Sequence, residues 1–171
     1  MIEVRPADID DIAYIVDLSA RVQAKLTASG SLQQIGPINR EVVSDYVMAR
    51  AAYVLDDGTR LGSVFVRSIH PESFSQFFQW ELHKLAAPVY FLSKLMIEPA
   101  RQGQGLGVTL LSGAVALFNK RKQGTLTLDC WAGNEKLRSF YSQNGFALHG
   151  IYPEEDFQVA VFYRRPVEKS A

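Results

Sequence analysis

The chain has 171 residues, of which 47% are hydrophobic and 21% are charged, which is enough for one globular domain with its own core. Its 18 basic residues balance its 18 acidic residues. This balance argues against a dedicated nucleic-acid-binding protein, because such proteins usually carry an excess of positive charge. The single cysteine, Cys130, excludes an intramolecular disulfide.

The beginning of the sequence, MIEVRPADIDD, is acidic and lacks the apolar core of a secretory signal. The sequence also contains no run of about 18 apolar residues, the length that a membrane-spanning helix requires. We therefore expect a cytoplasmic protein whose partners are neither nucleic acids nor membranes.

The first half of the chain is predicted to contain two helices and three strands. Asp8 and Asn39 are residue types that cap helix N-termini, and apolar residues follow each of them at helical spacing. Asp57-Gly58 supplies the positive φ that a tight turn needs, so the apolar stretches on either side predict a hairpin. The predicted elements are a strand at 2–5, helices after Asp8 and Asn39, and a hairpin at 51–69.

Residues 70–88 form an aromatic-rich segment in which Phe74, Phe77, Phe78 and Trp80 lie close together in sequence. Aromatic clusters are favoured both at protein interfaces and in ligand pockets. The segment is interpreted as a helix that covers part of the core, as a dimer contact, or as a lid or wall of a substrate pocket. The sequence leaves these alternatives open.

The second half of the chain is predicted to alternate strands and helices. The nearly continuous apolar run Val89–Ile97 predicts a central strand that is buried on both faces. Gly145 is the natural residue to end a helix, since it accepts a left-handed backbone. The other predicted elements are helices at 108–122 and 134–144, and strands at 125–129, 147–152 and 157–164.

Three glycines alternate at Gly103, Gly105 and Gly107, between the predicted strand at 89–97 and the helix from Val108. Glycines at this spacing let backbone N–H groups turn toward one point, at a helix N-terminus that favours an anion. The stretch therefore predicts a loop that binds a phosphorylated cofactor. The alternative is a glycine-rich turn that binds no ligand.

Two well-known phosphate loops do not fit this stretch. A nucleotide-hydrolase P-loop needs G-x-x-x-x-G-K-(S/T), but counted from Gly103 the second glycine and the lysine would fall at Val108 and Thr109. A dinucleotide-binding loop needs G-x-G-x-x-G, and its third glycine would also fall at Val108.

A third pattern does fit. The six residues from Gln102 to Gly107 match (Q/R)-x-x-G-x-(G/A), and the stretch from Asn134 to Phe146, with Tyr141 inside it, matches N-x-x-(A/L)-x-x-(F/Y)-Y-x-x-x-G-F. Both patterns belong to the GNAT N-acetyltransferase superfamily, where the first is the loop for the pyrophosphate of acetyl-CoA. The chain resembles this family specifically over residues 90–147.

The resemblance implies an α/β fold with a mixed, mostly antiparallel twisted sheet of six or seven strands, flanked by about four helices. The strands at 89–97 and 125–129 would be parallel and splayed at the centre of the sheet. The whole chain, residues 1–171, would form a single acetyltransferase domain.

The resemblance also implies acetyl-CoA as a cosubstrate, with no metal, and the three histidines indeed show no metal-ligand spacing. The loop N–H groups would hold the pyrophosphate, with Gln102 orienting the loop. The main chain around Met96 would pair with the pantetheine arm, and Asn134 would hydrogen-bond that arm. The residues implied to bind the cofactor are Leu95, Met96, Ile97, Gln102, Gly103, Gln104, Gly105, Leu106, Gly107 and Asn134.

Tyr141 is implied to be the general acid that protonates the departing thiolate, which is chemically reasonable because a phenol has a pKa of about 10 and a thiol of about 8.5. The alternative is that Tyr141 only packs in the core. No general base is identified: Phe91 stands where some family members carry a glutamate, which leaves Glu81 and His83 as candidates. Cys130 is predicted to be a buried, inert thiol.

The implied function is transfer of an acetyl group from acetyl-CoA to a primary amine of a small-molecule or peptide acceptor, by direct attack in a ternary complex. Three alternatives stay open: an acyltransferase that uses a longer acyl-CoA, a non-catalytic acyl-CoA-binding regulatory domain, and an interaction domain that uses the aromatic segment at 70–88. The identity of the acceptor and the formation of a homodimer are not determined by the sequence.

Overall fold

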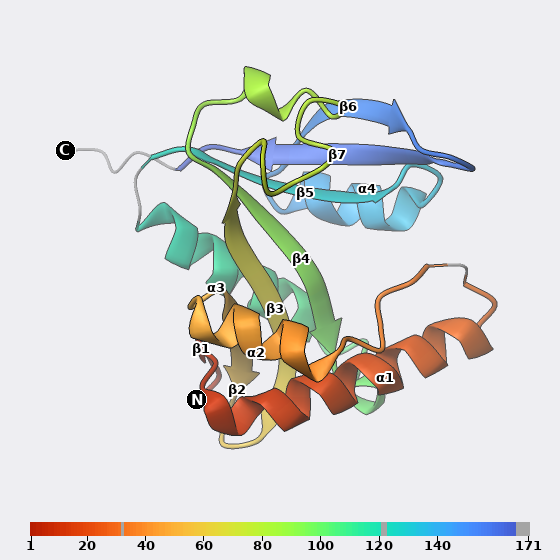
Figure 1. The fold of residues 1–171 in the computed structure, drawn as a ribbon. Helices are drawn as coiled ribbons and strands as arrows, with labels where there is room; N and C mark the ends of the chain where they lie inside the picture. The colour runs from red at the N-terminus through yellow and green to blue at the C-terminus, as the bar shows by residue number, and fades with distance from the viewer. Residues whose placement is uncertain (32, 121–122, 167–171) are drawn as a thin grey trace. The chain divides into compact units, whose positions relative to one another are not determined.

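The computed structural model describes residues 1–31, 33–120 and 123–166, and within these ranges the chain is an α/β protein (Figure 1). Seven strands form a mixed, mostly antiparallel sheet in the order β1-β2-β3-β4-β5-β7-β6, accompanied by four α-helices, as the sequence predicted. The strands are β1 (Glu3–Pro6), β2 (Ala52–Asp56), β3 (Arg60–Ile69), β4 (Val89–Ile97), β5 (Thr125–Trp131), β6 (Ala147–Pro153) and β7 (Gln158–Arg164). The helices are α1 (Ile12–Ala28), α2 (Arg40–Met48), α3 (Leu106–Asn119) and α4 (Glu135–Gln143).

Contacts between residues divide the chain into two compact units. The first unit comprises Met1–Val66 and Lys94–Ala114, and the second comprises Arg67–Ser93 and the chain from Val115 onward. β3, β4 and α3 each contribute residues to both units. Each unit buries an apolar cluster of its own.

In the first unit, α1 begins at Ile12, later than the predicted start just after Asp8. Asp8 instead caps a short 3₁₀ helix at Ile9–Asp11, where its side chain accepts the N–H of Asp10 at 2.9 Å. The carboxylate of Asp11 accepts the N–H of Asp8 at 2.8 Å in return, which completes a capping box. The predicted helix is confirmed, but this acidic turn precedes it.

The second predicted helix starts where the sequence placed it. The side chain of Asn39 accepts the N–H of Glu41 at 2.7 Å, so Asn39 is the N-cap of α2. α1 and α2 lie side by side in Figure 1 and bury their apolar faces in one cluster. The buried members of this cluster are Ala7, Ile12, Ile15, Leu18, Val22, Ile38, Val43, Val47, Ala52, Val54, Phe65 and Met96.

The predicted hairpin at 51–69 is formed by β2 and β3, which pair antiparallel with Tyr53 opposite Val64. The turn between them depends on Gly58, whose φ of 101° lies in the left-handed region that favours glycine. β1 adds to the outer side of β2, with Val4 opposite Leu55.

In the second unit, β4 and β5 run parallel, as the sequence predicted for the two central strands. Their register joins three residue pairs, from Val89 with Thr125 to Phe91 with Thr127. β5 is longer than predicted, because it continues to Trp131 and pairs antiparallel with β7 up to Val159. β7 in turn pairs with β6, which is the last strand of the sheet order.

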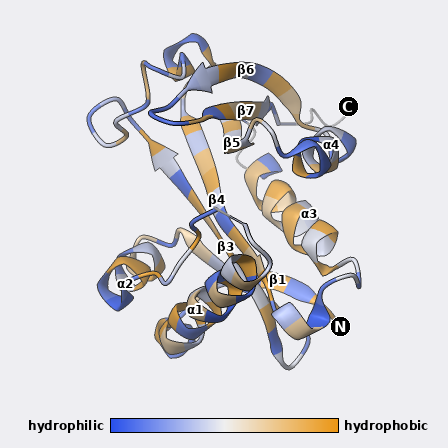
Figure 2. Cartoon of the chain, turned by 90° about the vertical axis from the view of Figure 1, so that its right-hand side faces the viewer, coloured by the Kyte–Doolittle hydropathy of each residue, from blue (hydrophilic) through white to orange (hydrophobic). Residues whose placement is uncertain are grey.

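α3 is apolar over most of its surface, whereas α4 is largely hydrophilic (Figure 2). A helix that is apolar around most of its circumference is buried on most sides. The buried residues of α3 are Leu106, Leu110, Leu111, Ala114, Val115 and Phe118. α3 begins at Leu106, two residues before the predicted start. Its predicted end at residue 122 lies outside the described residues.

The aromatic segment at 70–88 covers an apolar cluster of the second unit, as one interpretation held, but it does so without an α-helix. Only a short 3₁₀ helix at Leu82–Lys84 forms there. Isolated turns, such as Trp80 N–H to the Gln76 carbonyl at 2.8 Å, bring the aromatic rings inward. The cluster contains Ile69, Phe74, Phe77, Trp80, Leu82, Val89, Phe91, Tyr152, Val159 and Val161.

A buried carboxylate ties together the N-terminal part of the first unit. The side chain of Asp11 is fully buried and forms ion pairs at 2.7 Å with Arg5 of β1 and with Arg60 of β3. Burial by itself acts to raise the pKa of Asp11, but the hydrogen bonds from Arg5, from the N–H of Asp8 and from Arg60 outweigh it. The pKa of Asp11 is therefore well below its usual value, so this group stabilises the folded chain as a carboxylate.

Replacing Asp11 by Asn should lower the free energy of unfolding by about 3 kcal/mol near neutral pH, since two guanidinium groups lose the charge between them. Because folding lowers the pKa of Asp11, its stabilisation is present above about pH 4 and is lost as the pH falls further. Urea unfolding at a series of pH values should show this acid loss in the native chain and much less of it in D11N. The exposed Asp10→Asn control should change stability by less than about 0.5 kcal/mol. An equal effect of both substitutions would contradict this account.

Candidate cofactor and active site

The glycine loop has the backbone shape that an anion site requires. Gly103 and Gly105 adopt φ values of 83° and 76°, in the left-handed region that other residues rarely enter. A Cβ atom placed at Gly103, Gly105 or Gly107 would meet nothing within 4 Å, so the space beside the loop is open. The sequence prediction of a strand-to-helix glycine loop is confirmed in its local geometry.

The start of α3 leaves backbone donors available at this loop. Thr109 donates both its N–H and its hydroxyl to the carbonyl of Gly105, at 3.2 and 3.1 Å, and so closes the first turn. The N–H groups of the first residues of a helix have no partner within the helix, and the helix dipole makes this end positive. The loop and the first turn of α3 can therefore hold a phosphate-type anion.

The two glutamines of the loop are held by cations of the same unit. Gln102 accepts a hydrogen bond through Oε1 from the Lys25 ammonium at 3.2 Å, and Lys25 also donates to the Pro99 carbonyl at 3.1 Å. Gln104 accepts from the guanidinium of Arg101 at 2.8 Å. The loop is thus braced by side chains at its entrance, while Gly103 and Gly105 are exposed and Gly107 is half-buried.

The strand that leads into the loop is shaped for close contact with a neighbour. Lys94, in the middle of β4, has a φ of 54°, a left-handed conformation that costs energy for a residue with a Cβ atom. In the residues that follow, Leu95 is half-buried, and Met96 and Ile97 are buried. A Cβ atom at Gly62 of β3 would lie 2.5 Å from the carbonyl oxygen of Met96. A glycine at this position therefore lets the backbones of β3 and β4 approach each other closely.

Glu98, directly after β4, was not identified as a site residue from the sequence. Its carboxylate forms a fork with Arg21, at 2.5 and 3.0 Å, and accepts the hydroxyl of Tyr14 at 2.9 Å. The hydrogen bond from Arg21 is the main cause of its lowered pKa, and it outweighs the effect of burial. The signal in the sequence was the spacing of Tyr14, Arg21 and Lys25, which places these polar residues on one side of α1.

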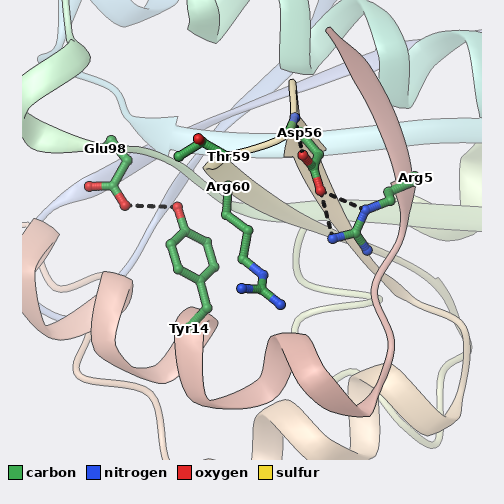
Figure 3. A pocket seen from close by; sticks show the side chains of 7 residues that line it. Arg5, Tyr14, Asp56, Thr59, Arg60 and Glu98 are labelled. Carbon is green, nitrogen blue, oxygen red and sulfur yellow. Dashed lines mark hydrogen bonds and ion pairs between the residues drawn. The ribbon is translucent and has the colours of Figure 1, made fainter. Parts of the chain in front are cut away.

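A cavity of about 560 Å³ lies in the first unit, and Figure 3 shows its side chains. Its charges are already paired: Arg5 with Asp56 at 2.9 Å, Tyr14 with Glu98, and Arg60 with Asp11. The arrangement serves as a bracing network, and none of the residues predicted from the sequence to bind the cofactor lines it. The lining residues are Arg5, Tyr14, Asp56, Gly58, Thr59, Arg60 and Glu98.

In the second unit, Tyr141 of α4 is buried at 7% exposure in an aromatic cluster. Its ring centroid lies 5.5 Å from that of Phe140, 5.8 Å from Phe162 and 6.1 Å from Phe146. Its hydroxyl has no hydrogen-bond partner among the residues that the structure describes. Burial, with smaller contributions from Cys130 and Asp129, raises the pKa of Tyr141 well above its usual value. The phenol therefore stays protonated throughout the neutral range.

Asn134 is the N-cap of α4. Its side-chain oxygen accepts the N–H of Leu137 at 3.0 Å and caps α4. This bond leaves the amide N–H donors of Asn134 for another partner. At the other end of α4, Gly145 has a φ of 90° and follows the C-cap, as predicted.

The two base candidates of the aromatic segment differ in their surroundings. Glu81 forms an ion pair with Lys84 at 2.8 Å and accepts the hydroxyl of Tyr152 at 3.2 Å. The hydrogen bond from Lys84 is the main cause of its lowered pKa, which makes Glu81 a weaker base. His83 is exposed, with its ring 5.3 Å from that of Phe78. Neither residue stands out as a general base.

The predicted site residues fall into two groups. The first unit contains Leu95–Ile97 and Gln102–Gly107, joined by the short segment at 98–101. The second unit contains Asn134 at the start of α4 and Tyr141 within it. Within the described part of the chain, no cluster of three or more His, Cys, Asp or Glu side chains is arranged to hold a metal ion. Over the same ranges, no helix is long and apolar enough to cross a membrane.

Comparison of the sequence with known families agrees with this geometry. The acetyltransferase (GNAT) family matches residues 38–146, which is more than half of the chain and includes the glycine loop and α4. The chain belongs to the GNAT acetyltransferase family, whose members transfer acyl groups from acetyl-CoA. A comparison with curated protein sequences finds no match.

Solved structures share the fold at low sequence identity. A GNAT-family acetyltransferase from Listeria monocytogenes superposes with a TM-score of 0.78 at 21% identity, over 96% of this chain and 94% of that one. One from Streptococcus agalactiae gives 0.73 at 19% identity, over 98% and 96%. The yncA protein of Salmonella typhimurium, solved with its cofactor acetyl-CoA, gives 0.71 at 17% identity, over 100% and 97%. These likenesses confirm the GNAT fold.

Cys130, the free thiol beside Tyr141, is buried on β5. Burial, with a smaller contribution from Asp129, raises its pKa to about 11. Little thiolate is therefore present near neutral pH, and the thiolate is the reactive form. The predicted burial of this thiol is confirmed, and its low reactivity stays a prediction.

A thiol-specific reagent such as iodoacetamide should therefore modify Cys130 in the folded chain at pH 7.5 at least about a hundredfold more slowly than in the urea-unfolded chain. The rate should rise with pH up to about pH 11, the pKa of this thiol. Mass spectrometry of quenched samples measures the rate. Rapid labelling of the folded chain at neutral pH would show that the thiol is accessible and activated.

Proposed function

We propose that the protein transfers the acetyl group of acetyl-CoA to a primary amine of a small-molecule or peptide acceptor. The observation that carries the proposal is the exposed left-handed glycine loop at the start of α3, in a chain that belongs to the GNAT family. Family membership supports acetyl-CoA as the donor, and the open space beside Gly103, Gly105 and Gly107 fits a diphosphate group. We further propose that residues 1–171 act as a single acetyltransferase domain.

The loop and the strand before it would hold the donor. The N–H groups from Gly103 to Gly107, with the positive end of α3, would bind the diphosphate. The main chain of Leu95, Met96 and Ile97 would pair with the pantetheine arm, and an N–H there would polarise the thioester carbonyl. The amide donors of Asn134 that its capping bond leaves available would bind the same arm.

The reaction would be a direct attack within a ternary complex. The neutral amine nitrogen forms a bond to the thioester carbonyl carbon, and the bond between that carbon and sulfur breaks. Tyr141 would give its phenolic proton to the departing sulfur, and the amine would lose its proton to water. Burial and the raised pKa keep the phenol of Tyr141 protonated at neutral pH, so the proton that this step transfers is in place before the reaction begins.

The proposal extends to the surroundings in which the protein works. The one cysteine is a free thiol, which suits a reducing compartment and supports a cytoplasmic location. The aromatic segment at 70–88 is a candidate to line the site that binds the acceptor amine. The same segment is also a candidate contact surface for a homodimer.

A thermal melt with acetyl-CoA tests the donor. With about 1 mM ligand and a dissociation constant on the order of 10 μM, mass action adds about 2.7 kcal/mol to the stability. For a chain of this size the midpoint should rise by roughly 5–10 °C. NAD and ATP at the same concentration are the controls and should produce no comparable rise. No rise with acetyl-CoA, in a protein freed of bound CoA, would refute the donor and favour the interaction-domain alternative.

Tyr141→Phe tests the general acid. In an assay of CoA release across a panel of amines, turnover should fall about a hundredfold or more, while the affinity for acetyl-CoA stays the same. Tyr163→Phe, which removes a phenol hydroxyl from β7 of the same unit, is the matched control and should keep native turnover. An unchanged turnover in Y141F would reduce Tyr141 to a packing residue. Tight binding of acetyl-CoA without turnover of any amine would favour a regulatory acyl-CoA-binding domain instead.

A further inference from the structure

Two cationic side chains on one side of α1 form hydrogen bonds with the segment between β4 and the glycine loop. Arg21 binds the carboxylate of Glu98, and Lys25, one helical turn later, donates to the Pro99 carbonyl at 3.1 Å and to Gln102 Oε1 at 3.2 Å. The two contacts lie at the start and at the end of this segment. Lys25 is thus the residue of α1 that touches the loop itself.

The partners of Lys25 differ from those of Arg21. Arg21 is neutralised by two carboxylates, Glu98 and Asp17. Both oxygens bound by Lys25 are uncharged, and the described ranges place no carboxylate within ion-pair distance of its ammonium. A positive charge without a local counter-charge therefore stands at the entrance to a loop whose backbone geometry suits an anion.

The contact with Lys25 also decides which way the amide of Gln102 points. An ammonium group can only donate, so the atom of Gln102 that faces it must be the carbonyl oxygen Oε1. The Nε2 atom, with its two N–H donors, then points away from Lys25. An amide held in this orientation can donate to a bound anion, in addition to the backbone N–H groups from Gly103 to Gly107.

The position of Lys25 is fixed by the packing of the helix that carries it. Ile15, Leu18 and Val22 on the adjoining side of α1 are buried in the same cluster as Met96 of β4. Lys25 stands in the last turn of α1, where the negative end of the helix dipole favours a cation. The core of the first unit therefore places the backbone of Lys25 beside the loop, and the exposed side chain reaches Pro99 and Gln102 from there.

We propose that Lys25 is a positioning residue for the donor molecule: it holds the Gln102 amide so that its N–H donors bind the diphosphate of acetyl-CoA. The proposal rests on the proposed function, because it assumes that the glycine loop binds this diphosphate. It adds a residue of α1 to a site that the motif of the family confines to the loop, β4 and α4.

The test compares two donors that differ in the diphosphate. Isothermal titration should show that Lys25→Met weakens binding of acetyl-CoA by about five- to tenfold, the effect of losing one exposed hydrogen bond. Binding of S-acetylpantetheine, which lacks the diphosphate, should be unchanged. Lys25→Arg, which keeps a charged donor, should recover most of the affinity. Arg40→Met removes one exposed charge from α2 and is the matched control, expected to bind acetyl-CoA like the native chain.

A double-mutant cycle separates positioning from a direct charge effect. If Lys25 acts through Gln102, then K25M should cost no further affinity in a chain that already carries Q102A. A full five- to tenfold loss in the Q102A background would overturn the proposal, because Lys25 would then act by itself. Native affinity in K25M, or an equal loss for S-acetylpantetheine, would overturn it as well. A native chain that fails to bind acetyl-CoA would refute the proposed function itself, which is a distinguishable result.

Discussion

The double attachment of α1 to the end of β4, apolar and ionic, is the constraint on which the first unit depends. The helix buries Ile15, Leu18 and Val22 in a cluster that includes Met96. Beside this apolar face, Arg21 and Tyr14 bind the carboxylate of Glu98. The buried apolar face packs the helix closely against the core, and the forked Arg–carboxylate contact adds a bond of fixed direction and distance. Together they set where β4 ends and therefore where the glycine loop begins.

The backbone of the glycine loop has a geometry that suits an anion, and its position follows from where β4 ends. Left-handed residues at Gly103 and Gly105 reverse the chain between β4 and α3 without any side chain in the way. Because the donors are backbone N–H groups, their positions depend on the chain path and hardly on side-chain identity. The side chains of the loop instead bind neighbouring cations: Gln102 accepts from Lys25, and Gln104 accepts from Arg101. What these side chains add is rigidity and charge at the entrance of the loop.

Burial governs the chemistry of the second unit. The aromatic rings around Tyr141 and the strand around Cys130 exclude water from both groups, which raises both pKa values because the charged forms lose solvation. Both groups therefore stay protonated near neutral pH. A thiol that keeps its proton is a poor nucleophile, so burial disfavours a covalent step at Cys130.

The sequence by itself determined the elements whose signals are local. The helix cap at Asn39, the turn at Gly58, the apolar strand Val89–Ile97 and the loop pattern from Gln102 to Gly107 each depend on neighbours a few residues away, and each formed as predicted. Only the tertiary structure decided the long-range contacts: the Asp11 carboxylate between Arg5 and Arg60, the grip of Arg21 on Glu98, and the inward packing of the segment at 70–88 without an α-helix. Ion pairs between residues far apart in sequence leave no periodic pattern, and aromatic residues bury equally well from turns and from helices. Such contacts are fixed by which surfaces the fold brings together.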